Sequence, residues 1–150
     1  MATHLFPHTD TTETVVVVTE SHVNAALLLL GRLIFGGFWV YSGFDHFINH
    51  ATLAPLAAMR GVPAPELAIF GTGVLLLAGG LSIMTGFVPK VGATLIAIFL
   101  IGVTPIMHAF WRDADAMQRA NDLVNFGKNI ALLGATCFVA AMPEPWSDGR

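Results

Sequence analysis

Apolar positions gather into four long runs, separated by short polar or turn-forming segments. The runs are Ala25–Phe44, Leu67–Met84, Val91–Met107 and a weaker one at Leu123–Met142. Each approaches the roughly 20 residues that a helix needs to cross a hydrocarbon layer of about 30 Å. The second and third runs contain no charged residue, and they lack the polar stripe of a surface helix. The pattern predicts an all-α integral membrane protein with four spanning helices.

The segments between the runs predict how the helices connect. His46–Pro65 is semi-apolar and too short to span, so we expect a short interfacial helix between the first two spans. Gly86–Lys90 is so short that the second and third spans must form an antiparallel hairpin. A polar connector, Arg112–Asp122, leads to the fourth span at about Asn125. The expected architecture is one up-down four-helix bundle.

Small residues recur along the runs and predict close approach of helix backbones, because packing drives helix association in lipid. These residues are Gly36, Gly37, Gly71, Gly73, Gly79, Gly80, Gly127, Ala131 and Ala135.

The chain divides into two tails and one membrane domain. Residues 1–23 are polar and Thr-rich, and no Lys or Arg precedes Arg32, whereas a cleavable signal peptide carries a basic start. We expect an N-terminal tail there, in which Val15–Val18 forms either a strand or an extension of the first helix. Residues 24–142 form the membrane domain, and residues 143–150 form a C-terminal tail.

Composition supports a membrane protein and excludes some functions. Hydrophobic residues make up 55% of the chain and charged residues 11%, whereas soluble domains are about a quarter charged. The net charge of −3, with no basic patch, excludes nucleic acid as a partner. The single cysteine, Cys137, excludes an internal disulfide or CxxC redox pair, and we expect it to be a buried apolar residue.

Up-down topology places most polar residues of the spans at one end of the bundle. This end collects Asp45, His46, His50, Glu66, His108, Trp111, Asp113, Asn125, Lys128 and Asn129. The opposite end holds mainly Thr85, Lys90 and the termini. Any chemistry is therefore expected at the first end. Its loops also carry more Arg and Lys, so the positive-inside rule predicts that it faces the cytoplasm.

One hypothesis for this end is a metal or haem site. His46 and His50 are four residues apart, so they share a side of a continuing helix, and His108 could join them. The alternative is that the helix ends after Gly43 and leaves two interfacial histidines.

A second hypothesis is a quinone headgroup site. His108 or Asp45 would hydrogen-bond a quinone carbonyl beside Trp111 and Phe110, with the apolar tail lying between helices. A third hypothesis is a structural polar cap, in which the side chains of the fourth span satisfy carbonyls of neighbouring loops. The residues of that cap are Asn125, Lys128 and Asn129.

Two cations within the runs need partners. Lys128, at the mouth of the fourth span, is expected to contact Asn125 one turn before it, or Asp45 or Glu66 across the bundle end. Arg32 lies inside the first span, where burial of a guanidinium costs several kcal/mol. It either faces the bundle and meets backbone carbonyls or a carboxylate, or extends to the interface.

Several segments together resemble a known family. The main one runs from Phe110-Trp111 through Met117-Gln118 to Asn125–Gly134. Earlier pieces are Arg32 with Gly36 and Ser42-Gly43, Met59–Pro63, and Gly79-Gly80 with Gly86. This set is similar to the DoxX family of small bacterial membrane proteins, over about Ala25 to Ala141.

The resemblance implies a four-span bundle in the bacterial cytoplasmic membrane. The family is named for a subunit linked to quinone-dependent sulfur or terminal oxidation, and some members are thought to support redox complexes. Relatives often carry a lysine where this chain has His46, and a glutamate in the second span near Leu75–Leu77.

The sequence pattern and the resemblance together lead to three alternative functions. The leading one is an accessory or quinone-linked subunit of a membrane redox system, with the lipid bilayer, redox proteins or further copies of the chain as partners. The rival is a stand-alone membrane oxidoreductase. A small transporter ranks below both, because the chain shows neither inverted repeats nor acids inside the spans.

Overall fold

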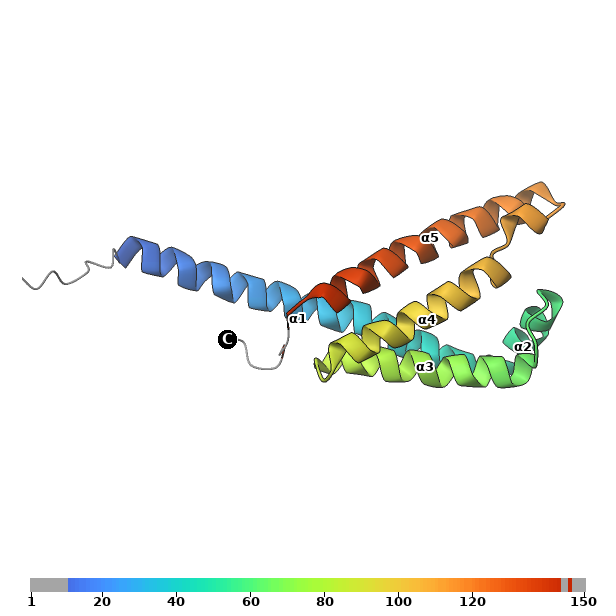
Figure 1. Cartoon of the computed structure of the whole chain (residues 1–150), viewed down its shortest axis with the longest axis horizontal. Helices are drawn as coiled ribbons and strands as arrows, with labels where there is room; N and C mark the ends of the chain where they lie inside the picture. Colours follow the sequence, from blue (N-terminus) through green and yellow to red (C-terminus); the bar gives the residue numbers. More distant parts are fainter. Residues whose placement is uncertain (1–10, 144–145, 147–150) are drawn as a thin grey trace, which may run out of the picture.

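The computed structural model describes residues 11–143 and residue 146, which fold into helices joined by short turns (Figure 1). The helices are α1 (Thr11–Ile48), α2 (His50–Met59), α3 (Pro65–Thr85), α4 (Pro89–Met107), the short 3-10 helix η1 (Phe110–Arg112) and α5 (Ala116–Ala141). Four segments are long and apolar enough to cross a bilayer: His22–Ile48, Pro65–Thr85, Pro89–Arg112 and Ala116–Ala141. The chain is therefore a multi-pass membrane protein, as predicted.

Helix α1 begins earlier than the hydrophobic pattern indicates. It contains 38 residues and is about 57 Å long, so it projects beyond the other helices at its N-terminal end (Figure 1). Residues 11–23, expected as part of a tail, continue this helix, and Val15–Val18 extends it rather than forming a strand. The rest of that predicted tail, and all of the C-terminal tail except Pro143 and Trp146, lie outside the described residues.

Helix α5 also begins earlier, because Asp115 caps it. The Oδ1 atom of Asp115 accepts a hydrogen bond from the backbone N–H of Gln118 at 2.8 Å. A capping carboxylate satisfies one of the free N–H groups of the first turn and starts the helix. The expectation that the connector extends to Asp122 is therefore wrong. Lys128 consequently lies near the middle of the 26-residue α5 and not at its mouth.

The spanning helices pack in chain order. Helix α1 contacts α3, α3 contacts α4, and α4 contacts α5, while α2 lies against α3 at one end (Figure 1). Helices α3 and α4 are thus inner helices, and α1 and α5 are outer ones. The buried core comes mainly from α3 and α4, with Trp39 of α1 inserted among their side chains. Its other members are Leu76, Ile83, Ala93, Ile96, Leu100 and Trp146.

Glycines set the spacing of the inner contacts. A Cβ atom on Gly36 would lie 2.8 Å from the carbonyl oxygen of Gly80, and one on Gly80 would lie 2.7 Å from that of Gly36. Gly79 and Gly92 bring α3 and α4 together in the same way. The predicted small-residue contact is wrong at Gly127 of α5, since a Cβ atom there would meet nothing within 4 Å.

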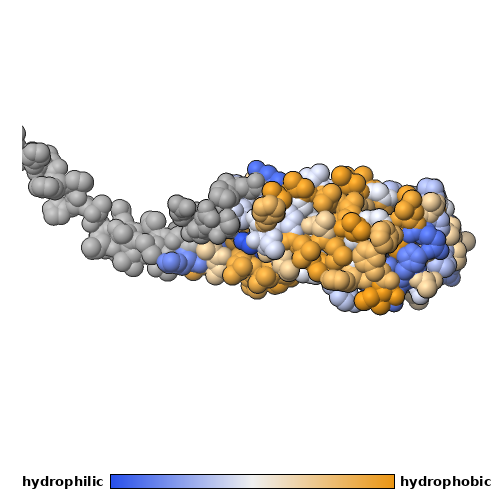
Figure 2. Space-filling view, turned by 90° about the horizontal axis from the view of Figure 1, so that it is seen from below, coloured by the Kyte–Doolittle hydropathy of each residue, from blue (hydrophilic) through white to orange (hydrophobic). Residues whose placement is uncertain are grey.

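Exposed apolar side chains form a belt along the spanning helices. On the face shown in Figure 2, hydrophilic residues gather at the end that holds α2 and the α4–α5 connection. The outer helices contribute much of this belt: Ile34 is 65% exposed and Phe138 is 75% exposed. Cys137 is exposed rather than buried, because α5 is an outer helix and Cys137 lies on a face that no other helix covers. Such surfaces suit contact with lipid tails.

Candidate functional site

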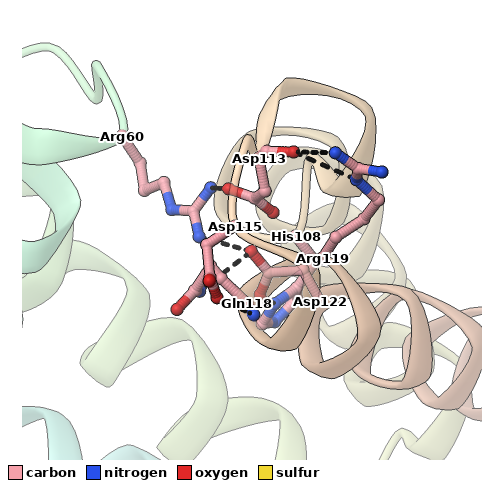
Figure 3. A network of polar contacts seen from close by, with 7 residues as sticks. All are labelled: Arg60, His108, Asp113, Asp115, Gln118, Arg119 and Asp122. Atoms are coloured by element: carbon pink, nitrogen blue, oxygen red, sulfur yellow. Dashed lines mark hydrogen bonds and ion pairs between the residues drawn. The ribbon is translucent and has the colours of Figure 1, made fainter.

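Arg60 links two loops at the polar end of the bundle. It follows α2 directly, and its guanidinium reaches the connection between α4 and α5 (Figure 3). Its Nη1 donates to Oδ1 of Asp113 at 2.9 Å, and its Nη2 donates to Oδ2 of Asp122. The side chains of Asp113 and Asp122 are only 10% and 6% exposed. One cation therefore ties together segments that are more than fifty residues apart in the chain.

Asp122 accepts from two further side chains. His108, which ends α4, donates from Nδ1 to Oδ1 at 3.2 Å, and Gln118 donates from Nε2 to Oδ2 at 3.3 Å. Arg119 holds the loop itself, because its guanidinium donates to the backbone oxygen of Asp113 at 2.8 and 3.0 Å (Figure 3). We call Arg60, His108, Asp113, Gln118 and Asp122 the Arg60 network.

The electrostatics of the Arg60 network favour the charged guanidinium. Burial acts to lower the pKa of Arg60, but the hydrogen bond to Asp113 and the charges of both carboxylates outweigh it, so that pKa is raised above its ordinary value. Arg60 therefore stays charged at any physiological pH. A paired, hydrogen-bonded buried cluster is costly to break, because removal of one member leaves the others uncompensated. The network can fasten the bundle end, and a hollow of about 540 Å³ opens beside it.

The structure confirms that the ends of the first and third spans and the starts of the second and fourth share one end of the bundle. It does not bring the predicted histidines together. His46 bonds to the carbonyl oxygen of Ser42 at 2.7 Å, His50 pairs with Glu66 at 3.0 Å, and His108 belongs to the Arg60 network. Among the described residues, no group of three His, Cys, Asp or Glu side chains is arranged to bind a metal ion.

The two residues predicted to hydrogen-bond a quinone carbonyl, Asp45 and His108, also have other partners. Asp45 accepts a hydrogen bond from Asn49 at 2.6 Å, and His108 is held by Asp122. Trp111 lies in an aromatic cluster with Phe110 and Phe126, whose ring centroids are 5.0 and 5.9 Å from it. This cluster joins η1 to α5 and is a packing contact.

Three of the predicted site residues, all in α5, line the same groove. Asn125, Lys128 and Asn129 line a groove of about 810 Å³ between α5 and α1. Their spacing of three and four residues puts them on one face of the helix. The other side of the groove belongs to α1, with Phe35 and Phe38. We call this space the α1–α5 groove; its remaining lining residues are Gly31, Ile34, Ala131 and Leu132.

Lys128 does not make the contacts predicted for it. In the described part of the chain its ammonium has no hydrogen bond or ion pair, and Asp45 and Glu66 are bound to Asn49 and His50 instead. The reason is the early start of α5, which carries Lys128 away from the bundle end and into the groove. An amine at this depth is costly unless an acceptor meets it.

Arg32 lies near the other end of the bundle and faces inward. Its Nη2 donates to the carbonyl oxygen of Met84 at 3.2 Å, and its Nη1 donates to that of Trp146 at 3.1 Å. The first contact places positive charge at the C-terminus of α3, where the helix dipole favours it. Gly86, with φ +75°, ends α3, and a Cβ there would lie 2.7 Å from the guanidinium carbon. The predicted alternative of backbone carbonyls is confirmed.

Sequence reasoning missed most of the Arg60 network. It placed Asp113 at the correct end but assigned no role to Arg60, Gln118 or Asp122. A signal was present: Gln118 and Asp122 are four residues apart, so a helix that starts at Asp115 puts both on one face, toward His108.

Comparison with known proteins supports a family. The sequence profile of the DoxX family matches residues 27–109, which is more than half of the chain. The match covers the first three spans and ends before α5. The segment Asn125–Gly134, which carries most of the resemblance noted in the sequence, lies in α5 and outside this match. Searches of curated proteins and of solved structures gave no significant match. On the family match, the chain belongs to the DoxX family.

Proposed function

We propose that the chain is a quinone-linked accessory subunit of a redox system in the bacterial cytoplasmic membrane. The α1–α5 groove is the observation that supports this function. It combines apolar and aromatic walls with three polar side chains at membrane depth.

The chemistry of the groove suits a quinone. A quinone offers a flat ring, two carbonyl oxygens that accept hydrogen bonds, and an apolar tail. The ammonium of Lys128 and the amide N–H groups of Asn125 and Asn129 are donors for those oxygens. Phe35 and Phe38 provide ring surfaces opposite the donors. A bound acceptor would also offset the cost of holding the amine of Lys128 in the bilayer.

The accessory role follows from the same side chains. Lysine, asparagine and phenylalanine can hold and orient a quinone, but they do not exchange electrons with it. Electrons would therefore pass between the quinone and a partner protein. The exposed apolar faces of the outer helices α1 and α5 offer surfaces for that partner within the membrane.

The test is to purify the protein in mild detergent and to extract and quantify bound quinone by chromatography. We expect quinone in wild-type protein and in Lys90→Met, and at least tenfold less in Lys128→Met. Lys90 is the matched control because it is the only other lysine and lies at the opposite end of the bundle. Equal quinone content in the two variants, or none in the wild type, would reject the proposal.

The partner is tested on the same membranes. Chemical crosslinking followed by mass spectrometry should capture a quinone-dependent dehydrogenase or oxidase on α1 or α5.

A visible spectrum of the pure protein distinguishes the accessory role from the rival function of a stand-alone oxidoreductase. A Soret band, or turnover of a quinone without any partner, would favour a stand-alone oxidoreductase instead.

A further inference from the structure

A second pocket lies near the α2 end of the bundle and has a different chemistry from the groove. It is a cavity of about 300 Å³ between α3 and α4, beneath α2. Its lining is apolar, with residues such as Ile69, Phe99 and Ile106, except for two side chains. These are His46 at the end of α1 and Thr72 in α3. Ligand pockets commonly combine an apolar wall with a few placed polar groups in this way.

Both polar side chains donate a hydrogen bond to a backbone carbonyl oxygen. The Nδ1 atom of His46 lies 2.7 Å from the carbonyl oxygen of Ser42, and because a carbonyl only accepts, Nδ1 carries the hydrogen. In the tautomer with the hydrogen on Nδ1, the lone pair is on Nε2, for which the described residues provide no partner. The hydroxyl of Thr72 donates to the carbonyl oxygen of Ala68 at 2.7 Å, so its oxygen also offers lone pairs. The two polar atoms of the cavity are acceptors.

We propose that this cavity binds a small apolar molecule that carries a hydroxyl group, such as a phenol or a hydroquinone ring. The hydroxyl donates to Nε2 of His46 or to the hydroxyl oxygen of Thr72, and the ring fills the apolar part. A cavity of about 150 Å³ holds benzene in a soluble protein, so about 300 Å³ accommodates a ring with a short substituent. The ring of Phe99, 6.0 Å from that of His46 in an edge-to-face contact, fixes the imidazole for this role.

The site is distinct from the α1–α5 groove in position and in selectivity. The groove presents the amine of Lys128 and is expected to bind carbonyl acceptors, whereas the cavity presents acceptors and is expected to bind a donor. The two proposals can therefore fail separately.

The experiment uses the full chain in lipid nanodiscs with ¹⁵N-labelled histidine. The probes are 4-propylphenol and its methyl ether, which share the ring and the alkyl chain but differ in the hydroxyl donor. The observable is the ¹⁵N resonance of Nε2 in His46. We expect the phenol to shift it saturably and the ether to bind about fivefold to tenfold more weakly, with little shift, as loss of one hydrogen bond implies.

A cavity-filling variant provides the control. Gly102 lines the cavity, and a Cβ atom there would meet nothing within 4 Å, so Gly102→Leu adds a bulky side chain to the lining with no clash at Cβ. Gly37→Leu is the matched variant, because its position is equally open but lies outside the cavity lining. We expect Gly102→Leu to reduce the phenol-induced shift strongly and Gly37→Leu to retain it. Equal shifts with phenol and ether, no saturable shift, or an unchanged shift in Gly102→Leu would overturn the proposal.

Discussion

Helix α1 has two faces that differ sharply. Toward α3 it is sealed: Gly36 and Gly80 bring the two backbones into contact. Toward α5 it is open: Gly31 lines a groove of about 810 Å³ between the two helices and has nothing within 4 Å of a built Cβ atom. Both faces lie within the same apolar span.

The difference teaches where stability and function reside in this bundle. Helices associate in lipid chiefly through close packing, so the α1–α3 face can supply stability. The α1–α5 groove contributes little packing and contains an amine that costs free energy to keep in the membrane. A residue that lowers the stability of the folded protein and has no evident structural role is a candidate for a functional residue.

The largest expected effect comes from breaking the sealed face. Gly80→Leu would force its side chain into backbone atoms of Gly36 and Val40, both 2.7 Å from the built Cβ atom. Ordinary overpacking costs about 1–3 kcal/mol, and a clash with backbone costs more. We expect little monodisperse protein on size-exclusion chromatography, whereas Gly37→Leu should resemble the wild type. Normal accumulation of Gly80→Leu would mean that the two helices are not in contact.

The next effect concerns the attachment of α5. Helix α5 contacts α4 and η1, and the Arg60 network fastens its start to the loop after α2. Asp122→Ala leaves Nη2 of Arg60, Nδ1 of His108 and Nε2 of Gln118 without their acceptor, at a cost of about 3–5 kcal/mol. Thermal unfolding followed by circular dichroism should show a large fall in the melting temperature.

Asp45→Ala is the matched control for that measurement, because Asp45 makes only an exposed hydrogen bond with Asn49. We expect at most about 1 kcal/mol of destabilisation for it. Similar melting temperatures for the two variants would contradict the structural role of the Arg60 network.

A smaller effect is expected at the far end of α1. Arg32→Met removes two hydrogen bonds to backbone carbonyls, each worth about 1.5–3 kcal/mol, but removal of a charge from the membrane offsets part of that loss. The buried indole of Trp146 loses its neighbour, so acrylamide should quench tryptophan fluorescence more strongly than in the wild type. Arg112→Met, at an exposed residue, should not change the quenching. Equal quenching in both variants would place Trp146 away from Arg32.

The smallest effect on stability is expected in the groove. Lys128→Met removes an amine that has no partner among the described residues, so the melting temperature should stay the same or rise slightly. Quinone affinity should nevertheless fall at least tenfold, measured by titration of a short-tailed quinone against the fluorescence of Trp39, which lies beside Phe38 at 4.9 Å between ring centroids. A fall in stability with unchanged affinity would make Lys128 a structural anchor.

Hydrophobicity and loop length predicted much of this fold. The uncharged runs of α3 and α4, and the short link at Gly86–Lys90, indicated an antiparallel hairpin, and the semi-apolar segment before Pro65 indicated α2. These features follow from local physics. The start of α5 was missed because a polar stretch looks like a loop until Asp115 is recognised as a cap.

The site was less predictable because it depends on helix rotation. Lys128 and the small residues Gly127 and Ala131 occupy the same turns of α5, and the sequence alone does not determine which of them faces a neighbour. Arg60 and Asp122 are 62 residues apart and meet only after the helices have packed. Asn125, Lys128 and Asn129 were identified as candidates, but their shared groove with α1 emerged only from the structure.

The central claim is that the open face of α1, and not its sealed face, holds a quinone. Photocrosslinking with an azidoquinone in native-like nanodiscs, followed by peptide mass spectrometry, tests it most directly. We predict labels on Phe35 or Phe38 of α1 and on residues 125–132 of α5, with competition by unlabelled quinone. Labels confined to other surfaces, or labelling of the groove that unlabelled quinone does not reduce, would contradict the account.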